Sequence, residues 1–393
     1  MISQETDPMP EPGQEAALLR VVHLGCSLGV GGVERWLLEV MRYHGRHYPG
    51  IQHVIIADGP RGQSLQDDFA SVASRIVNPD HWGTRALLRT ATAALHELGP
   101  FDLAHSHPFT SSGPLLRVAS GCRVPVRVAH SHNTSSTVSR RHPRLWPIYA
   151  RLAHAMIRRY ATHTMACSDA AAIGLFGSTK GVRLLPYGVP IERFDRARHE
   201  PPPADLGDER FLATISRLTP QKNVHVLVEL MAGMGPDAPR ALIVGDGPER
   251  ARIEKAIREH GLTGRVLLLG ERGDVPSILT HNVAAMLMPS EHEGLPVAAL
   301  EAQAAGVPLI VSESVTPQIE AVPGAVFRAE LAAGAAAWID VVKRALAESC
   351  DSLRASRVER FRGTPFTAQA SAEHLAGFYC QVTGRSIQSV RSN

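Results

Sequence analysis

Short apolar runs alternate with longer amphipathic segments along most of this chain. Runs of strand length occur at 18–24, 241–244, 265–269 and 284–288, and each is followed by a turn containing glycine or proline. The segments between the later runs have the length and periodicity of helices. Strands alternating with helices predict a parallel, doubly wound α/β sheet, whose ligand crevice lies at the carboxyl ends of the strands.

The segment 290–308 predicts a short helix at such a strand end. Pro296 suits the first helical position, because its missing N–H would have no partner inside the helix there. Gly306 followed by Pro308 suits the end of a helix. We therefore expect a helix over 296–305.

Two carboxylates flank the start of this helix. Glu293 would lie in the entry loop and Glu301 more than one turn inside, so they would contact different parts of one ligand. The backbone N–H groups of Gly294 and Leu295, with the helix dipole behind them, could bind a phosphate. A phosphate between two acids suggests a nucleotide sugar. The alternative is a half-buried helix whose acids only complement its dipole.

Two cations stand five positions apart in the loop after another apolar run. Arg217 can bind phosphate oxygens with a forked guanidinium, and Lys222 can add a point charge. Together they would offset the charge that develops on a departing diphosphate. The alternative is a pair of solvated surface cations.

Several of these motifs look familiar in their order and spacing. The runs 216–218 and 221–223, the Gly245-Asp246-Gly247-Pro248 turn and the stretch 293–301 resemble family 4 of the retaining, metal-independent glycosyltransferases. The resemblance covers nearly the whole chain after a short leader. It implies the GT-B fold, in which two doubly wound Rossmann-like domains face a central cleft. Ser216 stands where the family commonly has glycine.

The resemblance implies roles for the residues that match the family's motifs. Arg217 and Lys222 would bind the donor diphosphate, Glu301 the ribose, and Glu293 the transferred sugar. The backbone of the loop 270–274, including Glu271, would hold the base. The Ala-His-Ser-His-Asn-Thr run at 129–134 is similar to members that build capsular or exported polysaccharides.

The first half of the chain contains a glycine-rich turn at 29–34, between a predicted strand and a helix that begins near Trp36. Glycines there allow a backbone approach to phosphate that a side chain would block. A tight turn without a ligand is the alternative. By the resemblance, Gly32 approaches the diphosphate from the opposite domain, and the turn would be a lid that becomes ordered with the donor.

Two pairs of histidines, His105 with His107 and His130 with His132, each end an apolar strand. Alternate strand residues share a face, so such pairs could bind a metal. The resemblance offers a simpler role, because related enzymes carry a histidine near the sugar after the second of these strands. We favour His132 for that role and expect one of this pair to be a hydrogen-bonded structural histidine. His105, His107 and His130 are candidates for the acceptor side.

The length of 393 residues exceeds what one core usually contains, so two domains are expected. The prolines at 201–203 mark a linker. The predicted division is a disordered leader at 1–16, an acceptor domain at 17–200, a donor domain at 201–367, and a helix at 368–393 that returns to the first domain.

Composition narrows the class and location of the protein. The leader is polar and proline-rich, and no run reaches the roughly twenty apolar residues of a spanning helix. Five scattered cysteines indicate free thiols in a reducing cytoplasm. A net charge of +3 is too small to indicate nucleic acid. Residues 133–168 contain arginines and apolar residues but no acid, which is typical of contact with the anionic inner face of a membrane. The alternative is a packed helix with a solvated arginine face.

The predicted function is retaining transfer of a sugar from a nucleotide diphosphate sugar to a glycan, lipid-linked or small-molecule hydroxyl. Family frequency favours UDP. The predicted catalytic set is Glu293, His132, Arg217 and Lys222. No Asp-x-Asp element follows a strand, so we expect no divalent metal and no cofactor. A nucleotide-sugar 2-epimerase and a non-catalytic nucleotide-sugar-binding protein are the alternatives, since fold alone does not determine function.

Overall fold

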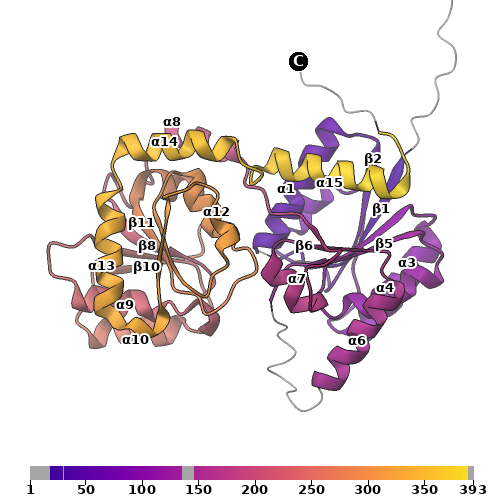
Figure 1. Ribbon diagram of the computed structural model, residues 1–393, viewed down its shortest axis with the longest axis horizontal. Helices are drawn as coiled ribbons and strands as arrows, with labels where there is room; N and C mark the ends of the chain where they lie inside the picture. The colour runs from indigo at the N-terminus through magenta and orange to yellow at the C-terminus, as the bar shows by residue number, and fades with distance from the viewer. Residues whose placement is uncertain (1–17, 30, 135–145, 388–393) are drawn as a thin grey trace, which may run out of the picture.

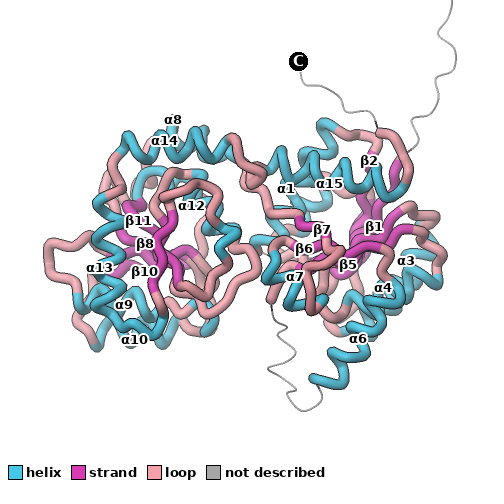
Figure 2. The backbone as a smooth tube through the Cα atoms, viewed as in Figure 1, coloured by secondary structure: helices cyan, strands magenta, loops and turns pink. Residues whose placement is uncertain are grey.

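The computed structural model describes residues 18–29, 31–134 and 146–387, which form two α/β domains (Figure 1). Strands occupy the middle of each domain and helices surround them, as Figure 2 shows. All strand pairs are parallel. The predicted fold class, two doubly wound Rossmann-like domains, is confirmed.

The first domain has a seven-stranded sheet in the order β3-β2-β1-β4-β5-β6-β7. Its strands are β1 Leu19–Cys26, β2 Ile51–Ala57, β3 Arg75–Val77, β4 Leu103–Ser106, β5 Val126–Ser131, β6 His163–Ala166 and β7 Arg183–Leu184. The helices of this part of the chain are α1 Gly32–His47, α2 Gln66–Ala70, α3 Thr84–Leu98, α4 Ser112–Gly121, α6 Trp146–Tyr160, α7 Asp169–Phe176 and α8 Ile191–His199. The order reverses between β1 and β4, so the crevice of this domain lies at their carboxyl ends.

The second domain has a six-stranded sheet in the order β10-β9-β8-β11-β12-β13. Its strands are β8 Phe211–Ile215, β9 Ala241–Val244, β10 Val266–Gly270, β11 Val283–Met288, β12 Leu309–Ser312 and β13 Val326–Ala329. The main helices of this part of the chain are α9 His225–Gly233, α10 Arg250–Glu259, α11 Val275–Ser277, α12 Val297–Ala304, α13 Gly334–Ala347, α14 Asp351–Arg362 and α15 Ala368–Thr383. Short η helices lie at Pro220–Lys222, Ile278–Asn282, Pro317–Ile319 and Leu331–Ala333.

The apolar runs of the sequence became the central strands of this second sheet. Every residue of β8, β9 and β11 is buried, as expected for parallel strands covered on both faces. The helix predicted over 296–305 is α12, Val297–Ala304, which begins directly after Pro296. Its start at the carboxyl end of β11 places the Glu293 loop on the functional edge of the sheet.

Helix α8 packs against the second domain. Arg198 donates from Nη2 to the Ala304 carbonyl oxygen at 3.0 Å, and His281 donates from Nε2 to the Ala197 carbonyl oxygen at 2.7 Å. The sequence boundary near residue 200 assigned this helix to the first domain. In the structure the crossover therefore comes earlier, between β7 and α8.

Helix α15 crosses back and lies against α1 of the first domain (Figure 1). Trp36 donates from Nε1 to Ser371 Oγ at 2.8 Å, and the Tyr43 hydroxyl donates to Glu373 Oε1 at 2.8 Å. The two helices together cover one face of the first sheet. None of the described helices combines the length and hydrophobicity needed to cross a bilayer.

Candidate active site

The two domains meet through closely packed backbone at their facing strand ends. A Cβ on Gly294 would lie 2.8 Å from the His132 carbonyl oxygen, and a Cβ on Gly32 would lie 2.9 Å from Val297 Cγ2. Ser168 adds a hydrogen bond from Oγ to the Gly294 carbonyl oxygen at 2.7 Å. Gly294 allows a close approach to backbone, and Gly32 to the Val297 side chain, so two of the predicted donor-binding glycines lie at the interface between the domains.

Lys222 forms an ion pair with Glu293, which directly precedes Gly294 in the chain. Lys222 Nζ donates to Glu293 Oε1, and the two side chains are only 18% and 8% exposed. They come from the loops after β8 and β11, which are neighbouring strands in the sheet. A buried ammonium and carboxylate are thus held together where the sequence placed a diphosphate and a sugar.

One side-chain and one backbone hydrogen bond hold these two loops together. Gln221 donates from Nε2 to the His292 carbonyl oxygen at 2.7 Å, and the Glu291 N–H donates to the Gln221 carbonyl oxygen at 2.9 Å. The loops therefore present Lys222 and Glu293 as one unit. Such prior organisation is what a site needs in order to stabilise developing charge.

Arg217 extends from the loop after β8 and is exposed. Its charge acts on Glu34, in the first turn of α1 of the opposite domain, and lowers the pKa of that carboxyl. Burial has the larger effect and raises the Glu34 pKa above its ordinary value. The Glu34 carboxylate is also hydrogen-bonded to its own N–H and to Ser27, so it occupies the start of α1 where a phosphate could bind.

The Gly245–Gly247 turn supports the Arg217 loop from behind. A Cβ on Gly245 would overlap the Ser216 carbonyl oxygen, and a Cβ on Gly247 would overlap the Leu218 carbonyl oxygen. The Leu218 N–H donates to the Asp246 carbonyl oxygen at 2.8 Å. The turn thus shapes the loop that carries Arg217.

Glu301 lies on α12 and is half-buried. Burial raises its pKa, while the charges of Arg35 on α1 and Arg193 on α8 lower it. Leu295 is buried at the entry to the same helix. Glu271 is exposed after β10, the edge strand, and so lies further along the sheet than Lys222 and Glu293.

His132 is half-buried beside Gly294, and both of its ring nitrogens are hydrogen-bonded within the protein. Nδ1 lies 2.7 Å from the Tyr187 hydroxyl, and Nε2 lies 2.9 Å from His107 Nδ1. Burial lowers the pKa of His132 well below its ordinary value, and the neighbouring His107 lowers it further. The ring is therefore neutral at pH 7.

The other predicted histidines lie deeper. His105 and His130 are fully buried and hydrogen-bonded to each other at 3.0 Å, and His105 also bonds the Tyr379 hydroxyl at 2.6 Å. His107 is almost fully buried. The structure therefore places these three candidates in the interior under α1 and α15, and not on an open acceptor surface.

His107 continues into a chain of histidines that the sequence analysis missed. His107 Nε2 lies 2.9 Å from His23 Nδ1, His23 Nε2 lies 3.0 Å from His53 Nδ1, and His53 Nε2 lies 3.1 Å from His44 Nδ1. His23 and His53 lie in the mainly apolar strands β1 and β2, His44 lies on the amphipathic helix α1, and His107 directly follows β4. A polar residue within an apolar strand is the sequence signal for His23 and His53, whereas His44 joins the chain through the packing of α1 on β2.

Comparisons with known proteins agree with this architecture. The family model described as "Glycosyltransferase Family 4" matches residues 30–193, and the model "Glycosyl transferases group 1" matches residues 195–355. The putative glycosyltransferase EpsF of Bacillus subtilis is 30% identical over 343 residues, which cover 84% of this chain and 88% of EpsF.

Two further similarities involve an enzyme and a solved structure. The UDP-Gal:alpha-D-GlcNAc-diphosphoundecaprenol alpha-1,3-galactosyltransferase of Escherichia coli is 30% identical over 228 residues, covering 54% of this chain and 58% of that enzyme. The crystal structure of Anabaena HepE with UDP and glucose has a TM-score of 0.72 at 17% identity. It covers 92% of this chain and 100% of HepE.

Proposed function

Because the chain belongs to the family 4 glycosyltransferases, we propose that it moves a sugar from a UDP-sugar to a hydroxyl of a glycan or lipid-linked acceptor, with retention of anomeric configuration. The buried Lys222–Glu293 pair carries this proposal. A binding protein needs the cation for the diphosphate but has less need of a buried carboxylate beside it. Transfer uses both.

The leaving diphosphate would be stabilised by protein groups. Lys222 and Arg217 supply positive charge, and the backbone N–H groups from Gly294 onward supply aligned dipoles. The acceptor hydroxyl attacks from the face that the diphosphate leaves. A donor phosphate oxygen takes the hydroxyl proton, and no divalent metal is needed at the diphosphate.

The sugar and ribose would be held by the two acids. Glu293 orients the sugar and supports positive charge at its anomeric carbon, while Glu301 binds the ribose diol. His132 would bind a sugar hydroxyl by exchanging one of its two hydrogen bonds, to Tyr187 or to His107. Glu34 would give up the start of α1 to the donor phosphate.

Relatives support the choice of donor and acceptor. HepE was crystallised with UDP and with UDP-glucose, and the E. coli relative is named for UDP-Gal and a diphosphoundecaprenol acceptor. These similarities favour uracil as the base and a lipid-linked glycan as the acceptor.

A thermal-shift panel with UDP, GDP, ADP and their sugars tests the donor site. A ligand at about a hundred times its dissociation constant stabilises the fold by about 2.7 kcal/mol, enough for a shift of a few degrees. We expect a shift with UDP that is absent in Lys222→Ala. Lys255→Ala is the matched control, because Lys255 is exposed on α10 and pairs only with Glu259 among the described residues.

No shift with any nucleotide would contradict the proposed donor site. Transfer itself is measured as UDP release that depends on an added acceptor. UDP release without an acceptor-dependent product would instead indicate hydrolysis. A changed sugar in the absence of any acceptor would indicate epimerisation.

We further propose that α6 contacts an anionic membrane. Ile148 and Leu152 stand one turn apart on α6 and are 60% and 58% exposed, and exposed Arg151, Arg158 and Arg159 lie on the same helix. The helix projects from the edge of the first domain (Figure 1). The rest of the basic segment, at 135–145, lies outside the described residues.

Co-sedimentation with vesicles containing phosphatidylserine tests this contact. We expect salt-sensitive binding that a double Ile148→Ser, Leu152→Ser variant loses, because each nearby cation adds about 1 kcal/mol and the apolar pair inserts. Ile173→Ser is the control, since Ile173 is equally exposed on α7. Equal binding by all variants, or none by the wild type, would refute the contact.

A further inference from the structure

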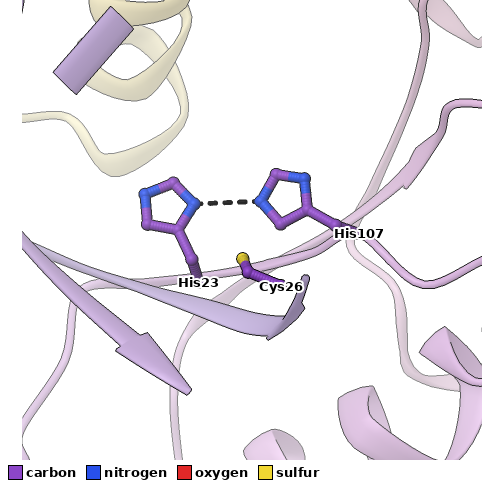
Figure 3. Close-up of side chains that lie close together, drawn as sticks. All are labelled: His23, Cys26 and His107. Atoms are coloured by element: carbon purple, nitrogen blue, oxygen red, sulfur yellow. Dashed lines mark hydrogen bonds between the residues drawn. The ribbon is translucent and has the colours of Figure 1, made fainter. Parts of the chain in front are cut away.

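Three buried side chains converge at the carboxyl ends of β1 and β4, the central strands of the first sheet. His23, Cys26 and His107 are 0%, 3% and 8% exposed, and each offers a ligand atom within 4.8 Å of the others. Figure 3 shows the two rings joined by a hydrogen bond, with the sulfur of Cys26 below and between them in this view. Imidazole and thiolate together are the preferred ligands of Zn²⁺.

A bulge in β1 brings Cys26 to the side of His23. Residues three apart on a regular strand face opposite sides of the sheet. The pairing of β1 with β2 shifts register between Leu24 and Cys26, and Gly25 there has φ of +67°. The extra residue reverses the alternation. Pro108 packs against Gly25, where a Cβ would lie 2.7 Å from Pro108 Cγ, and so fixes the turn beside His107.

The histidine chain determines the proton position on His23. Its far end is the Ala372 carbonyl oxygen, 2.8 Å from His44 Nε2, and a carbonyl can only accept. His44 therefore carries its proton on Nε2 and accepts at Nδ1. His53 therefore donates from Nε2 to His44 and accepts at Nδ1, and His23 donates from Nε2 to His53. The remaining nitrogen of His23, Nδ1, then has a lone pair directed at His107.

His107 can present a lone pair to the same point. If His107 carries its proton on Nδ1, it donates to His132 Nε2, and His132 then donates from Nδ1 to the Tyr187 oxygen. Every hydrogen bond of the chain survives except that between His23 and His107. The proton between the two rings moves to His107 Nδ1, so a cation replaces one hydrogen bond. The outer histidines orient the ligands as they do in known metal sites.

The Asp58 carboxylate lies close to Cys26. Burial raises the pKa of the Cys26 thiol, and the charge of this carboxylate raises it further. Gln63 and the Asp58 N–H are hydrogen-bonded to the carboxylate, whose Oδ1 is buried. The Asp58 N–H also donates to the Cys26 carbonyl oxygen at 2.9 Å. A divalent ion with one thiolate leaves one positive charge, which a neighbouring carboxylate would balance.

We propose that His23 Nδ1, Cys26 Sγ and His107 Nε2 bind a Zn²⁺ ion that ties the ends of β1 and β4 together. The two nitrogens, 2.9 Å apart, must separate to about 3.3 Å for tetrahedral bonds of about 2.05 Å. Binding releases the thiol proton, while each imidazole keeps one proton. The ion lies behind His132 and does not touch the donor diphosphate.

A second group, His105, His107 and His130, also has convergent ligand atoms. It shares His107 with the first group and has no thiolate, and its His105–His130 hydrogen bond would have to break. The two groups cannot be filled together through the same nitrogen. The first group is favoured because it includes the Cys26 thiolate.

The test measures metal content and Co²⁺ spectra of the full chain. Protein produced with added zinc and washed with EDTA should retain about one zinc ion per chain. Co²⁺ introduced during refolding should give a sulfur-to-metal charge-transfer band. Cys26→Ala and His23→Gln should lose both signals. Cys122→Ala should keep them, because Cys122 lies away from the cluster, next to His96.

Wild-type protein that retains no zinc and shows no charge-transfer band would overturn the proposal without any variant. A band that persists in Cys26→Ala would also overturn it. Sugar transfer is assayed separately, so neither result decides the proposed function.

Discussion

Replacing Arg217 or Lys222 with alanine should lower the turnover of sugar transfer by about a hundredfold or more, the scale of losing one oxyanion donor. Both side chains lie at the carboxyl end of β8, where the leaving diphosphate must be stabilised. Their charge acts on the transition state, in which the diphosphate gains negative charge. Steady-state kinetics at saturating donor measure the effect.

The two variants differ in their structural consequences. Lys222 is largely buried against Glu293, so its removal leaves a buried carboxylate without its partner and also reduces stability. Arg217 is exposed, so its removal should leave the unfolding temperature unchanged. Arg217→Ala is therefore the cleaner test. Turnover like that of the wild type in a folded Arg217→Ala protein would remove Arg217 from the site.

Replacing Gly245 with alanine should lower the free energy of unfolding by about 3 kcal/mol or more. Gly245 has φ of +131°, a region that residues with a Cβ almost never occupy. The new Cβ would also overlap the Ser216 carbonyl oxygen, which belongs to backbone and cannot turn aside. Equilibrium unfolding in urea measures the loss.

Gly273→Ala is the control for this prediction. Gly273 lies in a loop of the same domain, and a Cβ there would meet nothing within 4 Å. It should change stability by less than about 0.5 kcal/mol. The folded fraction of Gly245→Ala should also bind donor more weakly, because the Ser216–Leu218 loop carries Arg217. Equal stability of the two variants would show that the turn does not constrain that loop.

Local sequence patterns predicted the strands and helices named for the second domain and the residue types of its candidate site. The run at 241–244 is β9, and Pro296 with Gly306 delimited α12 to within one residue at either end. These signals are local, because burial on both faces of a parallel strand and the capping of a helix each depend on neighbouring residues. The sequence also placed Arg217, Lys222 and Glu293 in loops that follow strands.

Local sequence patterns did not predict how distant segments pack against each other. Helix α8 has the charged, amphipathic pattern of any surface helix, and nothing in its nine residues indicates which domain it covers. The Lys222–Glu293 ion pair joins residues 71 positions apart. It exists because β8 and β11 are neighbours in a sheet whose order is not the order of the chain.

By itself, the sequence determined the fold class, the family resemblance and the residue types of a nucleotide-sugar site, because these depend on local periodicity and on motif spacing. Only the tertiary structure decided that five histidines from α1, β1, β2 and the segments after β4 and β5 form one chain, and that Cys26 joins His23 and His107. Hydrogen bonds between rings depend on strand register and on a bulge at Gly25. Neither leaves a periodic trace in the sequence.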